Sequence, residues 1–389
     1  MFASLDAFAR RLADERANTL ARQIAIAEIA APTGHESRRA DMIARSLSNR
    51  GHDVHRDAVG NVLARLPCSA PRVESCAPVV VMAHLDTVFS ADVLPPVRRD
   101  GKRVVMPGIS DNGRGLSALV ELAELLRAPN LVAQMQHPVE LVATVGEEGD
   151  GNLRGARGYL DQREAVGASA PTAVIALDGP GDSLIVHHGI ASRRVRVMFS
   201  GEGGHPWAEP HAANAVHAAG LAVAALACFS DAQAPGVTVT VTRIGGGESL
   251  TSVPARAWFD VDLRALDAST VPRLHHTVCR LVERERGDIA VTYHVLGDRP
   301  GGSLDAHHPL VRLAADATRW QGREPQAASA STDANIALSR GIPAIAIGAG
   351  GNGGGTHTDH EWYDDTDGSR GIARALAVVV GAASGALRS

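Results

Sequence analysis

The chain has 389 residues, of which 45% are hydrophobic and 21% are charged, as in an ordinary globular protein. This length is too great for one small core and predicts two domains. The formal net charge of -5 shows no basic surplus and argues against a nucleic-acid partner. The four cysteines lack CxxC or CxxH spacing, which argues against a disulfide framework or a structural zinc site. No apolar stretch is long enough for a signal peptide or a membrane span, so we expect a cytoplasmic protein without a membrane partner.

Four short apolar runs occur in the outer parts of the chain, after an N-terminal segment of helical spacing. They are VVVMA (79–83), VELVATV (139–145), AVIAL (173–177) and IPAIAI (342–347). Each has the length of a strand, and continuous hydrophobicity is typical of strands that helices cover on both faces. Between the first two runs, apolar residues from Leu116 to Leu126 follow helical spacing. These segments predict an α/β domain.

The middle of the chain has a different pattern. RRVRVMFSG (193–201), GVTVTVTRIGG (236–246) and ARAWFDVDLRA (255–265) alternate polar and apolar residues, as half-exposed antiparallel strands do. Helical stretches at 214–229 and 270–286 are interleaved with them. We therefore interpret residues 191–306 as an inserted α+β domain. Residues 1–190 and 307–389 then form the two parts of the first domain.

Polar residues with metal-ligating side chains follow the apolar runs. The first run ends in His84-Leu85-Asp86, the second in Glu147-Glu148 and the third in Asp178-Gly179; the fourth leads through a glycine-rich loop to His357. Asp111, in GISDNGRG, precedes the helix that the sequence predicts between the first two runs. In open α/β sheets, ligands bind outside the carboxyl ends of the strands. We therefore expect these side chains to line one cleft.

Imidazole and carboxylate ligands together suit zinc, with manganese or cobalt as substitutes. Two histidines and three carboxylates are too many for one tetrahedral catalytic zinc, but they fit two ions that share a bridging carboxylate. One glutamate of the adjacent pair could then bind a metal ion, while the other takes a proton from metal-activated water. Taken singly, each feature has a simpler explanation as a hydrogen-bonded pair, a solvated face, a helix cap or a turn. Their coincidence at strand ends favours the metal site.

Longer motifs along nearly the whole chain resemble those of the M20 metallopeptidases, in particular the peptidase-T-like branch. They are AHLDTVF (83–89), PGISDNGRGL (107–116), TVGEEGDGNLRG (144–155), ALDG (176–179), SGEGGHPW (200–207), IGGGESLTSVPARAWFDVDLR (244–264), STDAN (331–335) and GIPAIAIGAGGNGGGTHTDHEW (341–362). The resemblance implies a di-zinc exopeptidase-type catalytic domain with a mixed central sheet flanked by helices. It also implies an inserted α+β dimerisation or lid domain, through which two chains would form a homodimer.

The resemblance assigns roles to individual residues of the metal site. One zinc ion would be held by His84, Asp111 and Asp178, and the second by Asp111, Glu148 and His357. Glu147 would be the general base, and Asp86 would hydrogen-bond the His84 ring and fix its tautomer. The peptide bond Asp111-Asn112 would be cis. His360 is a rival of His357, but Glu-Trp follows His357 at the family's spacing of four residues.

Further residues are candidates for binding the substrate. The resemblance implies that His205 reaches into the partner subunit's site and stabilises the oxyanion, and that Arg264 contacts a substrate carboxylate. Thr251 stands where relatives commonly have an asparagine that helps to bind the substrate or oxyanion, which puts the substrate class in question. Ser331 and Thr332 precede a predicted helix and could line the substrate pocket or cap that helix.

These expectations lead to a di-zinc hydrolase that cleaves an amide or peptide bond of small substrates, in the manner of an aminopeptidase acting on di- or tripeptides. An N-acyl-amino-acid deacylase would use the same machinery and is the alternative. A third possibility is a non-catalytic dimeric binding protein on the same scaffold. All five expected ligands and Glu147 are present, which favours an enzyme.

Overall fold

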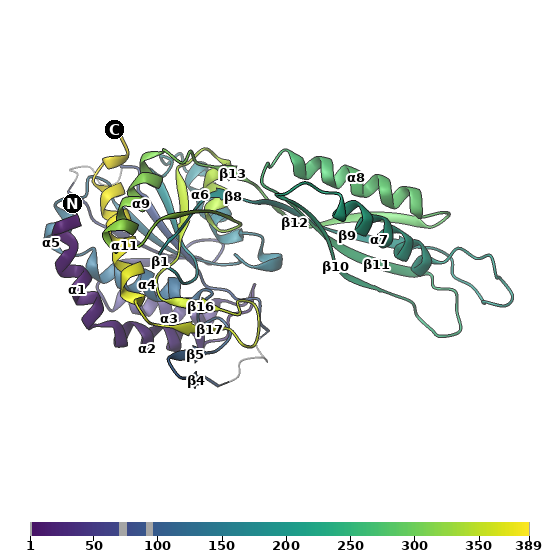
Figure 1. The fold of residues 1–389 in the computed structure, drawn as a ribbon, viewed down its shortest axis with the longest axis horizontal. Coiled ribbons are helices and arrows are strands. Elements are labelled where there is room, and N and C mark those ends of the chain that lie inside the picture. Colours follow the sequence, from purple (N-terminus) through teal and green to yellow (C-terminus); the bar gives the residue numbers. More distant parts are fainter. Residues whose placement is uncertain (1, 70–75, 91–95, 389) are drawn as a thin grey trace. The chain divides into compact units, whose positions relative to one another are not determined.

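The computed structural model describes residues 2–69, 76–90 and 96–388 (Figure 1). Its contacts divide the chain into two compact units. Unit 1 comprises Met1–Gly189 and Ser303–Ser389, and unit 2 comprises Ile190–Gly302.

Unit 1 is built on a nine-stranded mixed sheet with the order β1-β2-β6-β3-β7-β15-β8-β13, in which β14 also pairs with β8. The strands are β1 (Val54–Arg56), β2 (Val62–Leu66), β3 (Val79–His84), β6 (Val139–Thr144), β7 (Ala173–Leu177), β8 (Leu184–Gly189), β13 (Gly302–Ser303), β14 (Gln326–Ala330) and β15 (Ala344–Ile347). Strands β3, β6, β7 and β15 correspond to the four apolar runs, so the prediction of a buried sheet is confirmed.

Helices cover both faces of this sheet because its central strands are apolar on both sides. In β3, the side chains of Val79, Val81 and Ala83 belong to one core cluster, whereas those of Val80 and Met82 belong to another. The first cluster lies under α1 (Asp6–Asp14), α2 (Arg16–Ala27), α3 (Ser37–Ser48), α4 (Gly113–Leu125), α5 (Pro129–Val132), α9 (Pro309–Trp320) and α11 (Gly368–Ala383). The second lies under α6 (Arg154–Ala165) and α10 (Ala334–Ser339). The result is the three-layer arrangement of an α/β fold.

The four central strands bring their carboxyl ends to one edge of the sheet. Strand β3 pairs in parallel with β6 and β7, and β15 pairs in parallel with β7. In the β3–β6 ladder, His84 lies opposite Thr144. Segments that follow these strands therefore meet, although they are far apart in the sequence.

A small antiparallel sheet frames the neighbouring loops. Its order is β16-β17-β5-β4, with β4 (Arg98–Asp100), β5 (Arg103–Val105), β16 (Asn352–Gly354) and β17 (Trp362–Asp364). Trp362 pairs with Val105, which places the loop before β17 beside the segment that leads from β5 to α4. His357 lies in that loop, between β16 and β17.

Unit 2 has the α+β architecture that the alternating pattern predicts. Its antiparallel sheet has the order β10-β11-β9-β12, with β9 (Ala191–Ser200), β10 (Val237–Gly246), β11 (Arg256–Ala265) and β12 (Ala290–Arg299). Strand β12 is a fourth strand beyond the three that the sequence predicts. Helices α7 (Ala215–Asp231) and α8 (Thr270–Glu285) pack on this sheet and bury Val195, Phe199 and Phe259.

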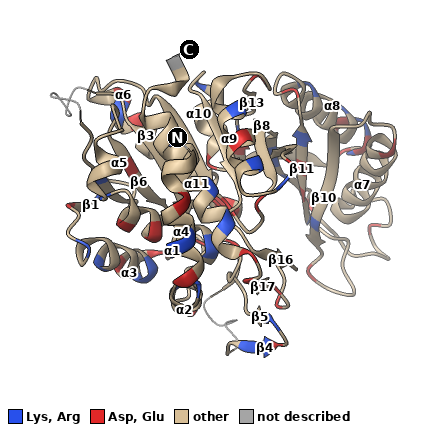
Figure 2. Ribbon diagram, turned by 60° about the vertical axis from the view of Figure 1, so that its left-hand side comes forward, with Lys and Arg blue, Asp and Glu red and all other residues tan. Residues whose placement is uncertain are grey.

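Charged side chains of both signs are interspersed over the surface helices, as α3 illustrates (Figure 2). Within the described residues, no helix combines the length and the hydropathy needed to cross a bilayer.

Candidate metal centre

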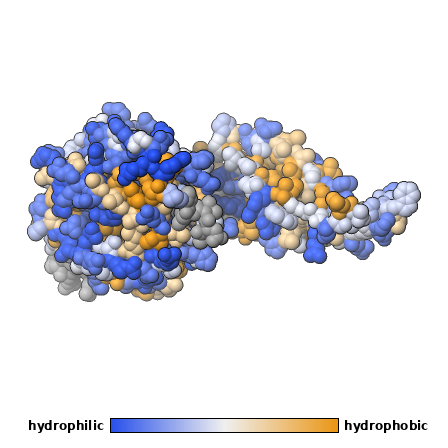
Figure 3. Space-filling view, turned by 90° about the horizontal axis from the view of Figure 1, so that it is seen from below, coloured by the Kyte–Doolittle hydropathy of each residue, from blue (hydrophilic) through white to orange (hydrophobic). Residues whose placement is uncertain are grey.

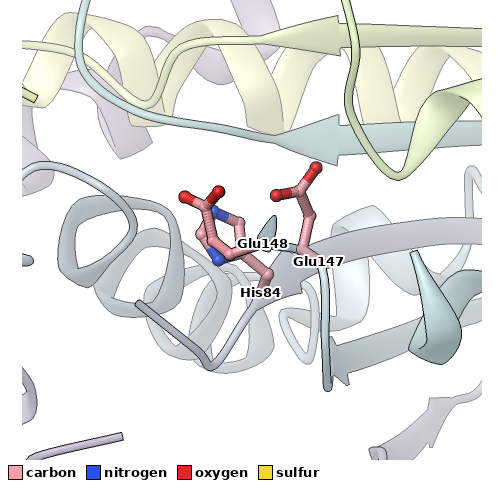
Figure 4. A group of neighbouring side chains, drawn as sticks. All are labelled: His84, Glu147 and Glu148. Atoms are coloured by element: carbon pink, nitrogen blue, oxygen red, sulfur yellow. The ribbon is translucent and has the colours of Figure 1, made fainter. Parts of the chain in front are cut away.

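The strand ends of unit 1 bring together three groups of side chains able to ligate a metal ion. Among the described residues, the groups are His84–Asp111–Asp178, Asp111–Glu148–His357 and His84–Glu147–Glu148. Within each group, the potential ligand atoms lie within 4.8 Å of one another. Figure 4 shows the His84 ring beside the Glu148 carboxylate, with Glu147 next to it. All five residues that the sequence proposes as ligands are therefore in one cluster, and the proposed base adjoins it.

Asp111 lies between the first two groups and has one carboxylate oxygen on each side. Its Oδ1 is 2.9 Å from Nε2 of His84, and its Oδ2 is 3.2 Å from Nε2 of His357. The same His357 nitrogen is 2.8 Å from Oε1 of Glu148, and the His84 nitrogen is 3.8 Å from Oδ1 of Asp178. A carboxylate in this position is able to bridge two cations.

The electrostatics of the cluster favour positive charge. Hydrogen bonds with the carboxylates of Asp111 and Glu148 raise the pKa of His357 to about 10. Burial lowers the pKa of His84, but the hydrogen bond with Asp111 and the nearby carboxylates of Asp178 and Asp86 outweigh it and raise that pKa well above its ordinary value. Burial likewise disfavours the Asp111 carboxylate, yet both imidazoles hold its pKa well below the usual range. The carboxylates thus favour positive charge at the position of both imidazoles. Together, these nitrogen and oxygen donors fit two divalent cations.

Asp86 supports the site differently from the expected ring hydrogen bond. Its carboxylate accepts hydrogen bonds from the backbone N–H groups of Glu147 and Glu148, both at 2.9 Å, and from the Thr33 hydroxyl at 2.8 Å. Nδ1 of His84 is 3.1 Å from the backbone carbonyl oxygen of Asp86 but 3.7 Å from its carboxylate. The carbonyl therefore orients the ring, because the carboxylate is engaged in holding the glutamate pair.

Asn112 joins the Asp111 segment to the end of β7. Its Oδ1 accepts hydrogen bonds from the N–H groups of Gly115, at 3.0 Å, and Gly179, at 3.2 Å, while its Nδ2 donates to the Leu177 carbonyl. The peptide bond Asp111-Asn112 is cis, as the resemblance implies. Asn112 thus caps α4 and links it to the turn that contains Asp178.

Of the two rival histidines, His357 is the one in the cluster. His360 is exposed and belongs to none of the three groups. His357 has a φ of 66°, in the left-handed region that side chains other than glycine rarely adopt. Such a conformation persists only where neighbouring contacts hold the loop.

Thr332 and Ser331 lie just before α10. The hydroxyl of Thr332 accepts a hydrogen bond from the N–H of Ala334, and its own N–H donates to Oδ1 of Asn335. Thr332 is buried and caps the helix, which is one of the two roles that the sequence leaves open. Ser331 is half-buried beside it.

His205 lies in unit 2 and is exposed. Its Nδ1 accepts hydrogen bonds from the N–H groups of Trp207 and Ala208, both at 3.2 Å. Its own N–H donates to Glu209 at 2.9 Å, which fixes the turn. Because Nδ1 accepts these bonds, a neutral His205 ring would carry its proton on Nε2.

Arg264 and Thr251 also lie in unit 2. Arg264 is bonded to the Asp262 carboxylate, with an Nη2–Oδ2 distance of 2.9 Å. In the structure, Arg264 therefore pairs with a carboxylate of its own strand, which is the structural alternative to contacting a substrate carboxylate. Thr251 is exposed, and its N–H and hydroxyl lie near the Ser249 hydroxyl.

Two buried acidic residues near the site were not expected. Asp333 accepts a hydrogen bond from the Thr144 hydroxyl, and its other carboxylate oxygen has no partner among the described protein groups. Burial raises the pKa of Asp333 to about 6. Glu361 accepts hydrogen bonds from the segment that contains Asp111. Asp333 lies in the motif STDAN and Glu361 in HTDHEW. The presence of acidic residues in these two motifs is the signal by which the sequence could have indicated them as site residues.

Comparisons with known proteins agree with this geometry. The sequence model of peptidase family M20/M25/M40 matches residues 80–380. Over 137 residues, the chain is 36% identical to the cytosol non-specific dipeptidase of Escherichia coli (strain K12), across 32% of this chain and 26% of that protein. Over 152 residues, it is 29% identical to the N-carbamoyl-L-amino acid amidohydrolase of Geobacillus stearothermophilus, across 39% of this chain and 31% of that protein.

Solved structures share the fold over almost the whole chain. A tripeptidase from Staphylococcus aureus superposes with a TM-score of 0.77 at 18% identity, covering 95% of this chain and 98% of that one. The YXEP protein of Bacillus subtilis, a dinuclear metal-binding peptidase of the M20 family, superposes with a TM-score of 0.67 at 16% identity, covering 98% and 99%. The chain belongs to peptidase family M20/M25/M40 and is a hydrolytic enzyme.

Proposed function

We propose that this hydrolase uses two zinc ions to cleave the amide bond of small peptides, such as di- and tripeptides. His84, Asp111 and Asp178 would hold one ion, and Asp111, Glu148 and His357 the other. The observation that carries the proposal is the position of Asp111, which directs one oxygen toward each histidine. Mn²⁺ or Co²⁺ could substitute for Zn²⁺, because the donors are nitrogen and oxygen atoms.

The ions, when bound, would polarise the substrate carbonyl and lower the pKa of a water molecule. Glu147 would accept the proton of that water and deliver it to the leaving nitrogen. Two features support this role for Glu147. Its carboxylate lies within 4.8 Å of the ligand atoms of His84 and Glu148, and its N–H is held by Asp86. The adjacent glutamates thus have different tasks, one as a ligand and the other as a base.

Peptides are the proposed substrates because a dipeptidase and a tripeptidase are among the similar proteins. The alternative is an N-acyl-amino-acid amidohydrolase, which the similarity to a carbamoyl-amino-acid amidohydrolase favours. The metal centre does not discriminate between them, since both reactions attack an amide carbonyl. Specificity would arise from pocket contacts worth about 1–3 kcal/mol each. Arg264 and Thr251, both exposed in unit 2, and Ser331 are the proposed contacts; Thr332 would act through its helix cap.

We further propose a homodimer in which unit 2 contacts the partner chain and His205 stabilises the oxyanion in the partner's site. Strand β10 is at an edge of its sheet, and such edges are common sites of association. Leu221 on α7 and Ile244 on β10 are more than half exposed. Figure 3 shows hydrophobic side chains gathered on one face of unit 2. The Nε2–H of His205 would provide the donor that an oxyanion requires.

Two variants test both parts of the proposal. Glu147→Gln should bind metal normally but lose about 10²–10⁴-fold in kcat, the usual contribution of a general base. His205→Ala should lose about 10²–10³-fold, as expected for an oxyanion donor. The assay should compare di- and tripeptides carrying a free amine with N-acetyl, N-succinyl and N-carbamoyl amino acids, with a chelator as control.

Mixing the two variants tests the exchange of His205 between subunits. A heterodimer would have one complete site, with Glu147 from the His205→Ala chain and His205 from the Glu147→Gln chain. Random reassociation should therefore restore about a quarter of wild-type activity. Activity of the mixture equal to the mean of the separate variants would contradict the shared site. Wild-type rates in Glu147→Gln would contradict the proposed base, and no hydrolysis by the metal-loaded wild type would favour a binding protein.

A further inference from the structure

Glu361 is a fully buried carboxylate that is surrounded by hydrogen-bond donors of one loop. Its Oε2 accepts from the N–H of Gly108 at 2.8 Å. Its Oε1 accepts from the N–H of Ser110 at 2.8 Å, from the Ser110 hydroxyl at 2.9 Å and from the N–H of Asp111 at 2.8 Å. Side chains of glutamate are seldom buried completely unless they are paired. Here three of the four donors are main-chain groups, and all four lie about 250 positions earlier in the chain.

These bonds connect two of the three segments that hold the residues of the Asp111–Glu148–His357 group, namely those of Asp111 and His357. Asp111 donates its own N–H to Glu361, while its carboxylate oxygens face His84 and His357. His357 lies four residues before Glu361 in the loop between β16 and β17. Main-chain bonds reinforce the connection, because the Glu361 carbonyl accepts from Met106 and the Glu361 N–H donates to Thr358. Glu361 therefore joins the loop of one ligand to the loop of another.

The conformation of His357 shows that its loop depends on such contacts. A φ of 66° is uncommon for any residue other than glycine, so interactions of the surrounding loop help to hold it. Half of the His357 side chain is exposed, so packing of the ring alone does not fix its position. Among the contacts of the described residues, those of Glu361 are the first after His357 that join this loop to the Asp111 segment.

We propose that Glu361 is a positioning residue that keeps Asp111 and His357 at the separation required to bind the second metal ion. It contacts neither the substrate nor the metal ions in this account and acts only through the two ligand loops. The inference rests on the proposed two-ion site and deepens it. The experiment must therefore distinguish an effect of Glu361 on metal affinity from an effect on folding stability alone.

The substitution Glu361→Gln is a sharp probe because glutamine has the same shape but replaces one acceptor by a donor. In one orientation, its amide nitrogen would face the N–H of Gly108. In the other orientation, it would face the N–H groups of Ser110 and Asp111. In either orientation, the amide N–H of glutamine points at a backbone N–H, and two donors cannot bond each other. We therefore expect the loop to shift and to leave buried N–H groups unpaired.

Two control variants are available. Glu121→Gln changes another buried carboxylate, which lies on α4 and pairs with Arg22 of α2 at 2.7 Å. In the described part of the chain, no hydrogen bond or ion pair joins Glu121 to a proposed ligand. Ser110→Ala removes only one of the four donors to Glu361 and leaves the three backbone bonds, so it should fold even if Glu361→Gln does not.

The measurement is Zn²⁺ binding to the metal-free protein, in competition with a chromophoric chelator, together with the unfolding midpoint without metal. Wild type should bind two equivalents. Glu361→Gln should bind the second equivalent about 10–100-fold more weakly, the usual effect of losing a group that orients ligands. Ser110→Ala should show a smaller loss of the same equivalent. Glu121→Gln should lower the unfolding midpoint without changing either affinity.

Wild-type affinity for both equivalents in Glu361→Gln and Ser110→Ala would overturn the positioning role while leaving the two-ion site intact. An equal loss of affinity in Glu121→Gln would also overturn it, because the effect would then follow from stability. Failure of the wild type to bind a second equivalent would instead contradict the proposed function on which the inference rests.

Discussion

Buried carboxylates organise this site by accepting hydrogen bonds from the backbone. Asp86 holds the N–H groups of the glutamate pair, and Glu361 holds those around Asp111. Glu36 accepts from Gly34 and from Gly146, directly before Glu147. Hydrogen bonds to a charged acceptor are worth about 1.5–3 kcal/mol, more than those between neutral groups. The positions of the ligands therefore depend on acidic residues that are not ligands themselves.

Asp333 gives a prediction about pH at the scale of a single residue. Burial raises its pKa from 3.8 to about 6, so between these values the folded protein retains a proton that the unfolded chain releases. The contribution of this proton to stability is complete below about pH 4 and is lost as pH rises through about 6. Between about pH 4 and 6, the unfolding free energy of the metal-free wild type should therefore fall by up to about 3 kcal/mol because of this group. In Asp333→Asn, this decrease should be absent.

Urea unfolding at several pH values would measure this effect. The same change at an exposed residue, Asp14→Asn, should leave the pH dependence of the wild type unaltered. Identical pH profiles for the wild type and Asp333→Asn would show that this carboxyl group titrates normally.

Residue identity predicted which side chains cluster at the strand ends but not the contacts that orient them. His84, Asp111, Glu148, Asp178 and His357 stand out because their side chains ligate metals and follow predicted strands. The hydrogen bonds of Glu361 could not be foreseen, because they connect positions about 250 apart in sequence and depend on the final loop geometry. The two possible roles of Thr332 were likewise separable only once its hydroxyl was seen at the start of α10.

At the scale of elements, the start of α4 is packed against the end of β7. A Cβ atom at Gly115 would lie 2.5 Å from the Leu177 carbonyl oxygen and would also clash with the Asn112 side chain. Neither neighbour is free to move, because Asn112 is bonded to Leu177 and Gly179. Glycine at this position therefore allows the helix that follows Asp111 to approach the strand that precedes Asp178.

Gly115→Ala should consequently lower the unfolding free energy by about 1–3 kcal/mol, the usual cost of overpacking, and weaken metal binding. Gly220→Ala is the matched control, because a Cβ at that position in α7 has no neighbour within 4 Å. It should raise stability by about 0.5–1 kcal/mol through helix propensity. Denaturant unfolding would measure both changes, and equal effects at the two positions would refute the close approach.

The sequence predicted those strands whose hydrophobic residues are buried, because a run of apolar residues indicates burial. Strands β7 and β15 are apolar throughout, β3 and β6 are mostly apolar, and the structure buries every one of their side chains. Strands β1, β4 and β16 are only three residues long and contain no buried residue, so periodicity had nothing to detect. The order of the strands depends on pairing between distant segments, which local patterns do not encode.

At the scale of the molecule, the parallel central strands of unit 1 account for the composition of the site. Their carboxyl ends deliver His84, the glutamate pair and Asp178 to one edge, and the small sheet adds the loop that contains His357. In unit 2, the exposed His205 accepts hydrogen bonds from its own loop through Nδ1. The proposed mechanism would therefore combine a metal centre in unit 1 with an assembly surface on unit 2.

The central claim is that Asp111 bridges two metal ions, and anomalous diffraction at the zinc absorption edge tests it most directly. Crystals of the zinc-loaded protein should give two peaks in unit 1, separated by about 3.5–4 Å. One peak should lie about 2.0–2.2 Å from ligand atoms of His84 and Asp178, and the other at the same distance from Glu148 and His357, with an Asp111 oxygen on each. A single peak, or two peaks without Asp111 between them, would contradict the account.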